Sequence, residues 1–272
     1  MFSPQSLSTM MQIFGEASRR FGVERLQRLQ QAMAMASTPG AAESSLAPLQ
    51  RPDLYFPGLR AQPWHAREAY AEAVDPLESH WQLIRDELER ALDGVHGFQA
   101  YQHQREGFYS SRDWNVMYFN YGRARIDQNR ALCPATAAAI DRVPRLAQIA
   151  MFSALAPGAR IRPHCGSNNC RITVHLPLKA GEGCRLRVGD ETRAWVPGRC
   201  LIFDDSFEHE ACNAGSETRF VLLLDLWHPD LNDAEVWVLE QIMTRVDAAA
   251  SQQELAQVLE QRGSTATSLL MG

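Results

Sequence analysis

With 272 residues, of which 45% are hydrophobic, the chain is long enough to bury one large core or two small ones. Its 32 acidic and 27 basic residues give a net charge of −5, which excludes a general electrostatic attraction to nucleic acid or to anionic membranes. No stretch approaches the length of an apolar membrane span, and the first residues lack the basic start and apolar run of a secretion signal. We therefore expect a cytoplasmic protein without a membrane span.

The first 53 residues divide into a helical segment and a linker. Within residues 4–35, apolar side chains recur at helical intervals with Arg and Gln between them. This pattern predicts two short amphipathic helices and an N-terminal helical segment over 1–36. Residues 37–53 are rich in Ser, Ala, Pro and Gly, a composition typical of a linker. The apolar faces of such helices are more often docking surfaces than membrane contacts.

The rest of the chain is predicted to be mainly β with flanking helices (α+β), in a double-stranded β-helix, also called a jelly-roll or cupin-like fold. A helix over about 78–92 is expected to pack on a sheet. After Tyr109, short alternating or apolar segments are separated by turn-forming residues, as in a β-sandwich or jelly roll. These segments are WNVMYFNYG, IAMFSALAPG, CRITVHLPL, CRLRVGD, TRAWVPG, RCLIFDD and RFVLLLDLW. We predict a jelly-roll domain with packing helices over 54–231 and a C-terminal helical segment over 232–272.

Six cysteines are spread over the β-rich part of the chain. A chain of this size does not need disulfides, a cytosol keeps thiols reduced, and the paired CxxC spacing of structural zinc sites is missing. We therefore expect free and mostly buried thiols. The six are Cys133, Cys165, Cys170, Cys184, Cys200 and Cys212.

Two histidines are the strongest candidates for chemistry. His164 lies in RPHCGSNNC and His209 in DDSFEHEA, 45 positions later, with Arg219 ten residues after the second. His164 is expected at a strand end and His209 at the end of a loop. Neighbouring strand ends of a jelly roll can meet at one metal, and imidazole suits Fe(II). The carboxylate usual two residues after the first histidine is replaced by Gly166. Alone, such a pair is more often structural than metal-binding.

A wider set of motifs changes that balance. The chain resembles the aspartyl/asparaginyl β-hydroxylase family of 2-oxoglutarate-dependent dioxygenases over about two thirds of its length. The matching segments are YFPGLRAQPW, the RDW around Trp114, PGARIRPHCGSNNCRITVHLPL, ETRAW, LIFDDSFEHEACN and DLWHPDL. In that family two histidines and water bind the iron, and glycine stands where other members of the wider superfamily have the carboxylate. Gly166 therefore fits the resemblance.

The resemblance implies roles for eight residues. His164 and His209 take the iron-ligand positions, and Arg219 takes that of an arginine whose forked guanidinium matches the distal carboxylate of 2-oxoglutarate. The other positions match Ser153, His175 and Trp114 as further contacts of this co-substrate, Asp205 as a catalytic residue that hydrogen-bonds an iron-bound water, and Arg171 as a contact of the substrate's acidic group. Thr173 departs from the pattern, because hydroxylases of peptidyl Asp and Asn have a second arginine there. Asp204 and Glu208 are expected to be solvated or structural.

The chemistry implied is hydroxylation of an unactivated carbon. Fe(II) would be the cofactor, 2-oxoglutarate and O2 the co-substrates, and succinate and CO2 the products. The leading substrate is the β-carbon of an Asp- or Asn-type residue that is peptidyl, free or bound to a carrier protein. Two alternatives stay open: a relative that hydroxylates a lipid acyl chain, and a jelly-roll binding module without turnover. We expect no nucleic-acid partner.

Overall fold

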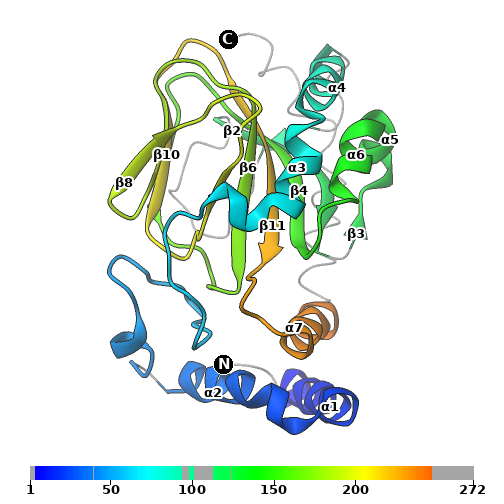
Figure 1. The fold of residues 1–272 in the computed structure, drawn as a ribbon, viewed down its shortest axis with the longest axis vertical. Coiled ribbons are helices and arrows are strands. Elements are labelled where there is room, and N and C mark those ends of the chain that lie inside the picture. Colours follow the sequence, from blue (N-terminus) through cyan, green and yellow to red (C-terminus); the bar gives the residue numbers. More distant parts are fainter. Residues whose placement is uncertain (1–3, 39, 94–97, 101–112, 123, 247–272) are drawn as a thin grey trace.

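The computed structural model describes residues 4–38, 40–93, 98–100, 113–122 and 124–246, and it has two antiparallel β-sheets at its centre (Figure 1). The larger, seven-stranded sheet has the order β1-β2-β4-β11-β6-β9, with β3 paired to β2, and the four-stranded sheet has the order β5-β10-β7-β8. The strands of the larger sheet are β1 (Gln99–Ala100), β2 (Trp114–Tyr121), β3 (Ala124–Arg125), β4 (Leu146–Leu155), β6 (Arg171–Lys179), β9 (Leu201–Phe203) and β11 (Arg219–Trp227). Those of the smaller sheet are β5 (Arg160–His164), β7 (Cys184–Val188), β8 (Glu191–Ala194) and β10 (His209–Asn213).

The two faces of the larger sheet serve different purposes. Because successive side chains of a strand point to opposite faces, Ile172, Val174 and Leu176 of β6 join the core beneath the helices, while Thr173 and His175 face the smaller sheet. Strands β4 and β11 follow the same rule. The second core lies between the sheets and combines residues of both. This arrangement confirms the predicted jelly roll.

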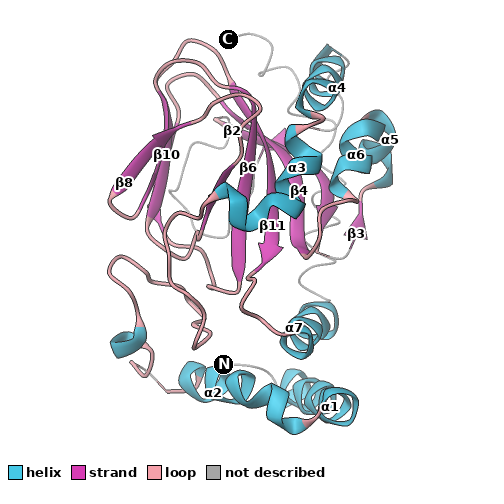
Figure 2. Ribbon diagram, viewed as in Figure 1, coloured by secondary structure: helices cyan, strands magenta, loops and turns pink. Residues whose placement is uncertain are grey.

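Helices α3 (Ala71–Glu78), α4 (Trp81–Asp93) and α6 (Pro134–Ile140) cover the outer face of the larger sheet (Figure 2). The 3-10 turn Arg67–Tyr70 precedes α3, and α5 (Asp127–Leu132) contacts β2 and α6. The predicted helix over 78–92 is confirmed as α4. Helices α5 and α6 were not anticipated, because six and seven residues are too few to show a clear helical period. Pro134 starts α6 at a position where a missing N–H costs nothing.

The terminal helices form a third layer. Helices α1 (Pro4–Phe21) and α2 (Gln27–Ala36), linked by the 3-10 turn Val23–Leu26, confirm the two predicted N-terminal helices. They share a core with α7 (Asp233–Arg245), in which the rings of Phe21 and Trp237 lie 5.8 Å apart. The predicted C-terminal helix is thus present to Arg245, and residues 247–272 lie outside the described part. No helix in the described ranges is long and apolar enough to cross a membrane.

The six cysteines are free, as expected, although only Cys133, Cys170 and Cys184 are fully buried. Burial raises the pKa of the thiols of Cys133 and Cys170 to about 12, so both stay protonated.

Candidate functional site

A cavity of about 460 Å³ opens between the two sheets. Alternate residues of β4, β6 and β11 form one wall, and the facing ends of β5 and β10 form the other. All eight residues predicted from the sequence line it: Trp114, Ser153, His164, Arg171, His175, Asp205, His209 and Arg219. The strand pairing therefore gathers residues that are as far as 105 positions apart in the chain (114 to 219) into one cavity.

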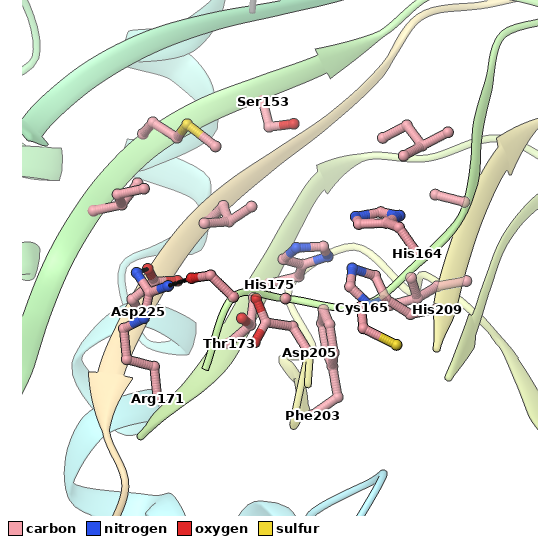
Figure 3. Close-up of a pocket in the computed structure, with 18 of the residues that line it drawn as sticks. Ser153, His164, Cys165, Arg171, Thr173, His175, Phe203, Asp205, His209 and Asp225 are labelled. Atoms are coloured by element: carbon pink, nitrogen blue, oxygen red, sulfur yellow. Dashed lines mark hydrogen bonds and ion pairs between the residues drawn. The ribbon is translucent and has the colours of Figure 1, made fainter. Parts of the chain in front are cut away.

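His164 and His209, which the sequence suggested as metal ligands, lie side by side in the cavity. His164 is the last residue of β5 and His209 the first of β10, they are partners in the strand register, and their ring centroids lie 4.0 Å apart (Figure 3). Nδ1 of His164 lies 2.8 Å from the Arg162 carbonyl, and Nδ1 of His209 lies 3.0 Å from the Phe207 carbonyl. A carbonyl can only accept, so each Nδ1 carries a proton, and in a neutral ring the lone pair that a metal requires is then on Nε2.

Burial keeps His209 in the form that can bind a metal. Burial lowers the pKa of His209, so its imidazole is neutral near pH 7. The donor set of two neutral imidazoles fits Fe(II) among other borderline metals. Within the described residues, no group of three or more His, Cys, Asp and Glu side chains has metal-binding geometry.

The carboxylate of Asp205 fills the space beside Gly166, the position from which a third ligand side chain would extend. A Cβ atom built on Gly166 would lie 2.6 Å from the Asp205 carboxylate carbon, so the glycine leaves room for that carboxylate. Its Oδ1 atom is buried and has no hydrogen-bond partner among the described residues. Burial raises the pKa of Asp205, and the positive charge of Arg171 opposes the shift. A buried carboxylate oxygen without a donor is costly unless a bound group supplies one.

Arg219 is a buried cation without an acidic partner in the described part of the chain. It lies at the start of β11, is 2% exposed, and its Nε atom has no hydrogen-bond partner there. Its guanidinium carbon lies 4.7 Å from the ring centre of Trp195, and within the described residues its hydrogen bonds are two long ones, of 3.4 and 3.5 Å, to Ser153. Burial lowers the pKa of Arg219 to about 10. Such a group has the properties of an anion site.

Two tryptophans orient the polar groups beside Arg219. Trp114 Nε1 donates to Ser153 Oγ at 2.9 Å, and Trp195 Nε1 donates to His175 Nδ1 at 3.2 Å. Burial, Arg219 and His209 hold the pKa of His175 well below its usual value, so the ring is neutral and its proton is on Nε2. His175 is thus a hydrogen-bond donor toward the cavity. Trp195 was quoted in the ETRAW motif but received no role from the sequence.

The end of the cavity opposite the histidine pair is built around Arg171. Its NH1 atom donates to Asp225 Oδ2 at 2.9 Å and to Gln148 Oε1 at 2.5 Å (Figure 3). Burial raises the pKa of Asp225 to about 6, and Arg171 opposes the shift. Asp225 lies directly across from Thr173 in the register of β6 and β11. Sequence reasoning missed Asp225, although the alternation of RFVLLLDLW places it on the same strand face as Arg219.

Asp204, expected to be solvated or structural, is 1% exposed. Its Oδ1 atom accepts from the backbone N–H of Ser206, and burial raises its pKa to about 7. Glu208 forms an ion pair with Arg187 at 2.9 Å. Both residues therefore support the loop between β9 and β10 that carries Asp205.

Comparison with known proteins gives one matching family. The family model described as aspartyl/asparaginyl beta-hydroxylase matches residues 78–229. The aspartyl/asparaginyl beta-hydroxylase of Homo sapiens is 37% identical over 183 residues, which are 64% of this chain and 24% of that protein. Aspartate beta-hydroxylase domain-containing protein 2 of Homo sapiens is 34% identical over 203 residues, 71% of this chain and 55% of that protein. The chain therefore spans about a quarter to about half the length of these relatives.

Proposed function

This chain belongs to the aspartyl/asparaginyl β-hydroxylase family, and we propose that it is an Fe(II)- and 2-oxoglutarate-dependent dioxygenase. The reaction would consume 2-oxoglutarate and O2, hydroxylate an unactivated carbon of the substrate and release succinate and CO2. The observation that carries the proposal is the buried guanidinium of Arg219, without a carboxylate partner in the described residues, in the same cavity as the histidine pair.

His164 and His209 would hold the iron. Their Nδ1 atoms donate hydrogen bonds to backbone carbonyls, which fixes the ring orientations. The Nε2 atoms, on the opposite side of each ring, would then be the ones that bind the metal. Asp205 would accept a hydrogen bond from a water at the metal, which would satisfy its buried Oδ1 atom. When bound, Fe(II) would supply the activation of O2 and, together with 2-oxoglutarate, the oxidation of the substrate's C–H bond.

The residues around Arg219 would bind 2-oxoglutarate. Arg219 would pair with the carboxylate distant from the keto acid, because a guanidinium binds a carboxylate through two parallel hydrogen bonds. His175, with its proton on Nε2, and the hydroxyl of Ser153 would donate further hydrogen bonds, and Trp114 would hold that hydroxyl. Apolar side chains of Ile149, Met151, Leu186 and Leu223 complete the walls and limit the access of water.

The substrate would bind toward Arg171. A hydroxylase of the β-carbon of Asp- or Asn-type residues needs a polar anchor one or two bonds beyond the reacting carbon. Arg171 lies in the cavity away from the histidine pair (Figure 3), and it pairs with Trp227 at the opposite end of β11 from Arg219. We infer a peptidyl, free or carrier-bound substrate of this class. Thr173 in place of a second arginine, and Asp225 beside Arg171, make this end less positive than a two-arginine anchor.

The test is an anaerobic titration of Fe(II) and 2-oxoglutarate, followed by the visible charge-transfer band of the ternary complex. We expect a band in the wild type, no band in His164→Ala, and a band in Arg219→Ala only at much higher 2-oxoglutarate concentration. Aerobic 2-oxoglutarate consumption then distinguishes an enzyme from a binding module. A wild type with no band and no tight iron would refute the proposal.

A further inference from the structure

Residues 47–56, here called the strap, cross the loop that follows His164 and the loop that precedes His209, the two candidate iron ligands. The sequence predicted a linker up to residue 53, and the strap lies N-terminal to the residues matched by the family model, which begin at 78. In the structure the strap is bonded to both loops, and its Asp53 lines the cavity. Any role of the strap at the iron site rests on the proposed function.

The first set of bonds joins the strap to the loop between β9 and β10, which carries Asp205 and ends at His209. Glu208 N donates to the Leu49 carbonyl at 2.7 Å, and Arg51 N donates to the Ser206 carbonyl at 3.0 Å. Gln50 and Phe207 form a bridge of the antiparallel type between them. The strap therefore holds the backbone from Ser206 to Glu208, which lies between Asp205 and His209.

The second set joins the strap to the loop that comes after His164. Leu54 N donates to the Ser167 carbonyl at 2.8 Å. Phe56 N donates to Asn169 Oδ1 at 2.7 Å, and Asn169 Nδ2 returns a bond to the Phe56 carbonyl at 2.9 Å. One continuous segment thus fixes the loop after the first ligand and the loop before the second.

Gln50 is the buried centre of the strap. Its side chain is 0% exposed, its Nε2 atom donates to Ser206 Oγ at 2.9 Å, and its Oε1 atom accepts from Ala47 N at 3.3 Å. The preceding residue, Leu49, has a positive φ of 63°, a conformation that is unfavourable for a residue with a side chain. Such strain persists only where the surroundings enforce it, and here it directs the Leu49 carbonyl to the N–H of Glu208.

We propose that Gln50 is a positioning residue of the active site, which sets the place of Asp205 and His209 through its bond to Ser206. Ser206 lies next to Asp205, and its backbone N–H also donates a hydrogen bond to Asp204 Oδ1. Loss of the Gln50 bond would let the loop relax away from the geometry needed at the metal. Groups that orient ligands in this way are worth about 10- to 100-fold in metal affinity or activity.

The experiment compares full-length wild type with Gln50→Met, Ser206→Ala and the double variant. Methionine keeps the volume of glutamine and removes both side-chain hydrogen bonds. We expect the Kd for Fe(II), measured anaerobically with 2-oxoglutarate present, to rise about tenfold in each single variant. The double variant should show no further rise, because both changes break the same bond. Ser206→Ala removes only one oxygen and serves if Gln50→Met does not fold.

Asn129→Leu is the matched control. Asn129 is also a buried amide, with Nδ2 bonded to the Tyr118 carbonyl at 2.7 Å, but it does not line the cavity. We expect this variant to lose stability toward urea while its Kd for Fe(II) is unchanged. The strap proposal is overturned if Gln50→Met and Ser206→Ala bind iron like the wild type, or if Asn129→Leu weakens binding as much as they do. A wild type that binds neither iron nor 2-oxoglutarate refutes the proposed function itself.

Discussion

The carboxylate of Asp205 occupies the space that a side chain at position 166 would need. A Cβ atom on Gly166 would lie 2.6 Å from Asp205 Oδ1 and 2.7 Å from Oδ2, far inside van der Waals contact. The two residues are also joined by a hydrogen bond of 2.7 Å from Gly166 N to the Asp205 carbonyl. A side chain at position 166 and Asp205 in its present place therefore exclude each other.

Gly166→Ala should displace Asp205 and the adjoining ligand loops. We expect the Kd for Fe(II) to rise by about 10- to 100-fold, because the change disturbs the group that orients the metal site. Gly166→Ala combined with Asp205→Gly should recover most of the iron affinity but not turnover. Gly181→Ala is the control, since nothing lies within 4 Å of its added Cβ atom. Wild-type iron binding by Gly166→Ala would contradict the proposed clash.

Arg219→Met should separate stability from binding. Removing a buried charge that lacks an acidic partner should raise the free energy of unfolding in the absence of ligands by about 1–2 kcal/mol. The Kd for 2-oxoglutarate should rise about 100-fold, because charge-assisted hydrogen bonds to the carboxylate are lost. Urea unfolding and ligand titration measure the two effects.

Arg171→Met is the contrasting change to Arg219→Met. Arg171 is paired with Asp225 at 2.9 Å, so its removal leaves a buried carboxylate uncompensated. We expect the free energy of unfolding to fall by about 3 kcal/mol. If Arg219→Met destabilised the chain as strongly as Arg171→Met, the interpretation of Arg219 as an unpaired cation would be wrong.

Trp195→Phe should weaken the binding of 2-oxoglutarate while keeping an aromatic ring against the Arg219 guanidinium. The indole N–H that fixes the His175 tautomer is lost, so Nδ1 can take the proton and Nε2 can become an acceptor. We expect a five- to tenfold higher Kd for 2-oxoglutarate, about the value of one hydrogen bond. Trp64→Phe is the matched control: Arg193 packs on its ring at 4.3 Å, but its Nε1 atom has no partner among the described residues. Equal effects of the two variants would argue against the tautomer explanation.

Asp204 should make stability depend on pH. Its pKa is raised by burial from 3.8 to about 7, so between these values the folded chain holds a proton that the unfolded chain has lost. The buried protonated carboxyl of Asp204 contributes fully to the free energy of unfolding below pH 3.8, and this contribution is lost as the pH rises through about 7. The free energy of unfolding then falls by at most about 1.4 kcal/mol per pH unit. Asp204→Asn keeps the Oδ1 acceptor for Ser206 N and should remove this slope. Urea unfolding of both proteins across the window measures it, and parallel curves would contradict the shift.

The helices and strands could be predicted where the spacing of apolar residues along the sequence is regular. The alternation of β2, β4, β6 and β11 identified the strands of the larger sheet, and the helical spacing of residues 4–35 identified α1 and α2. The eight residues that the resemblance singled out all line the cavity.

The remaining features depend on pairing between distant segments, which no local pattern encodes. Asp225 reaches Arg171 because β11 and β6 are neighbours, and Gln50 reaches Ser206 because the strap crosses a loop 156 positions away. A glutamine in a segment rich in Pro and Ser resembles an ordinary linker residue until its burial is known. Trp195 likewise gains its role only from the distance between its indole N–H and His175.

Strand β6 carries Arg171, Thr173 and His175 on one face, and Ile172, Val174 and Leu176 of the helix-covered core on the other. Insertion or deletion of a single residue within β6 would exchange the two faces, so that the side chains of Arg171 and His175 would point into the helix-covered core. The length of this strand should therefore be invariant among functional relatives. A substitution at Thr173 changes only the cavity face, so we expect it to alter the choice of substrate without disturbing the core. Changes in chain length should be confined to the loops at the strand ends.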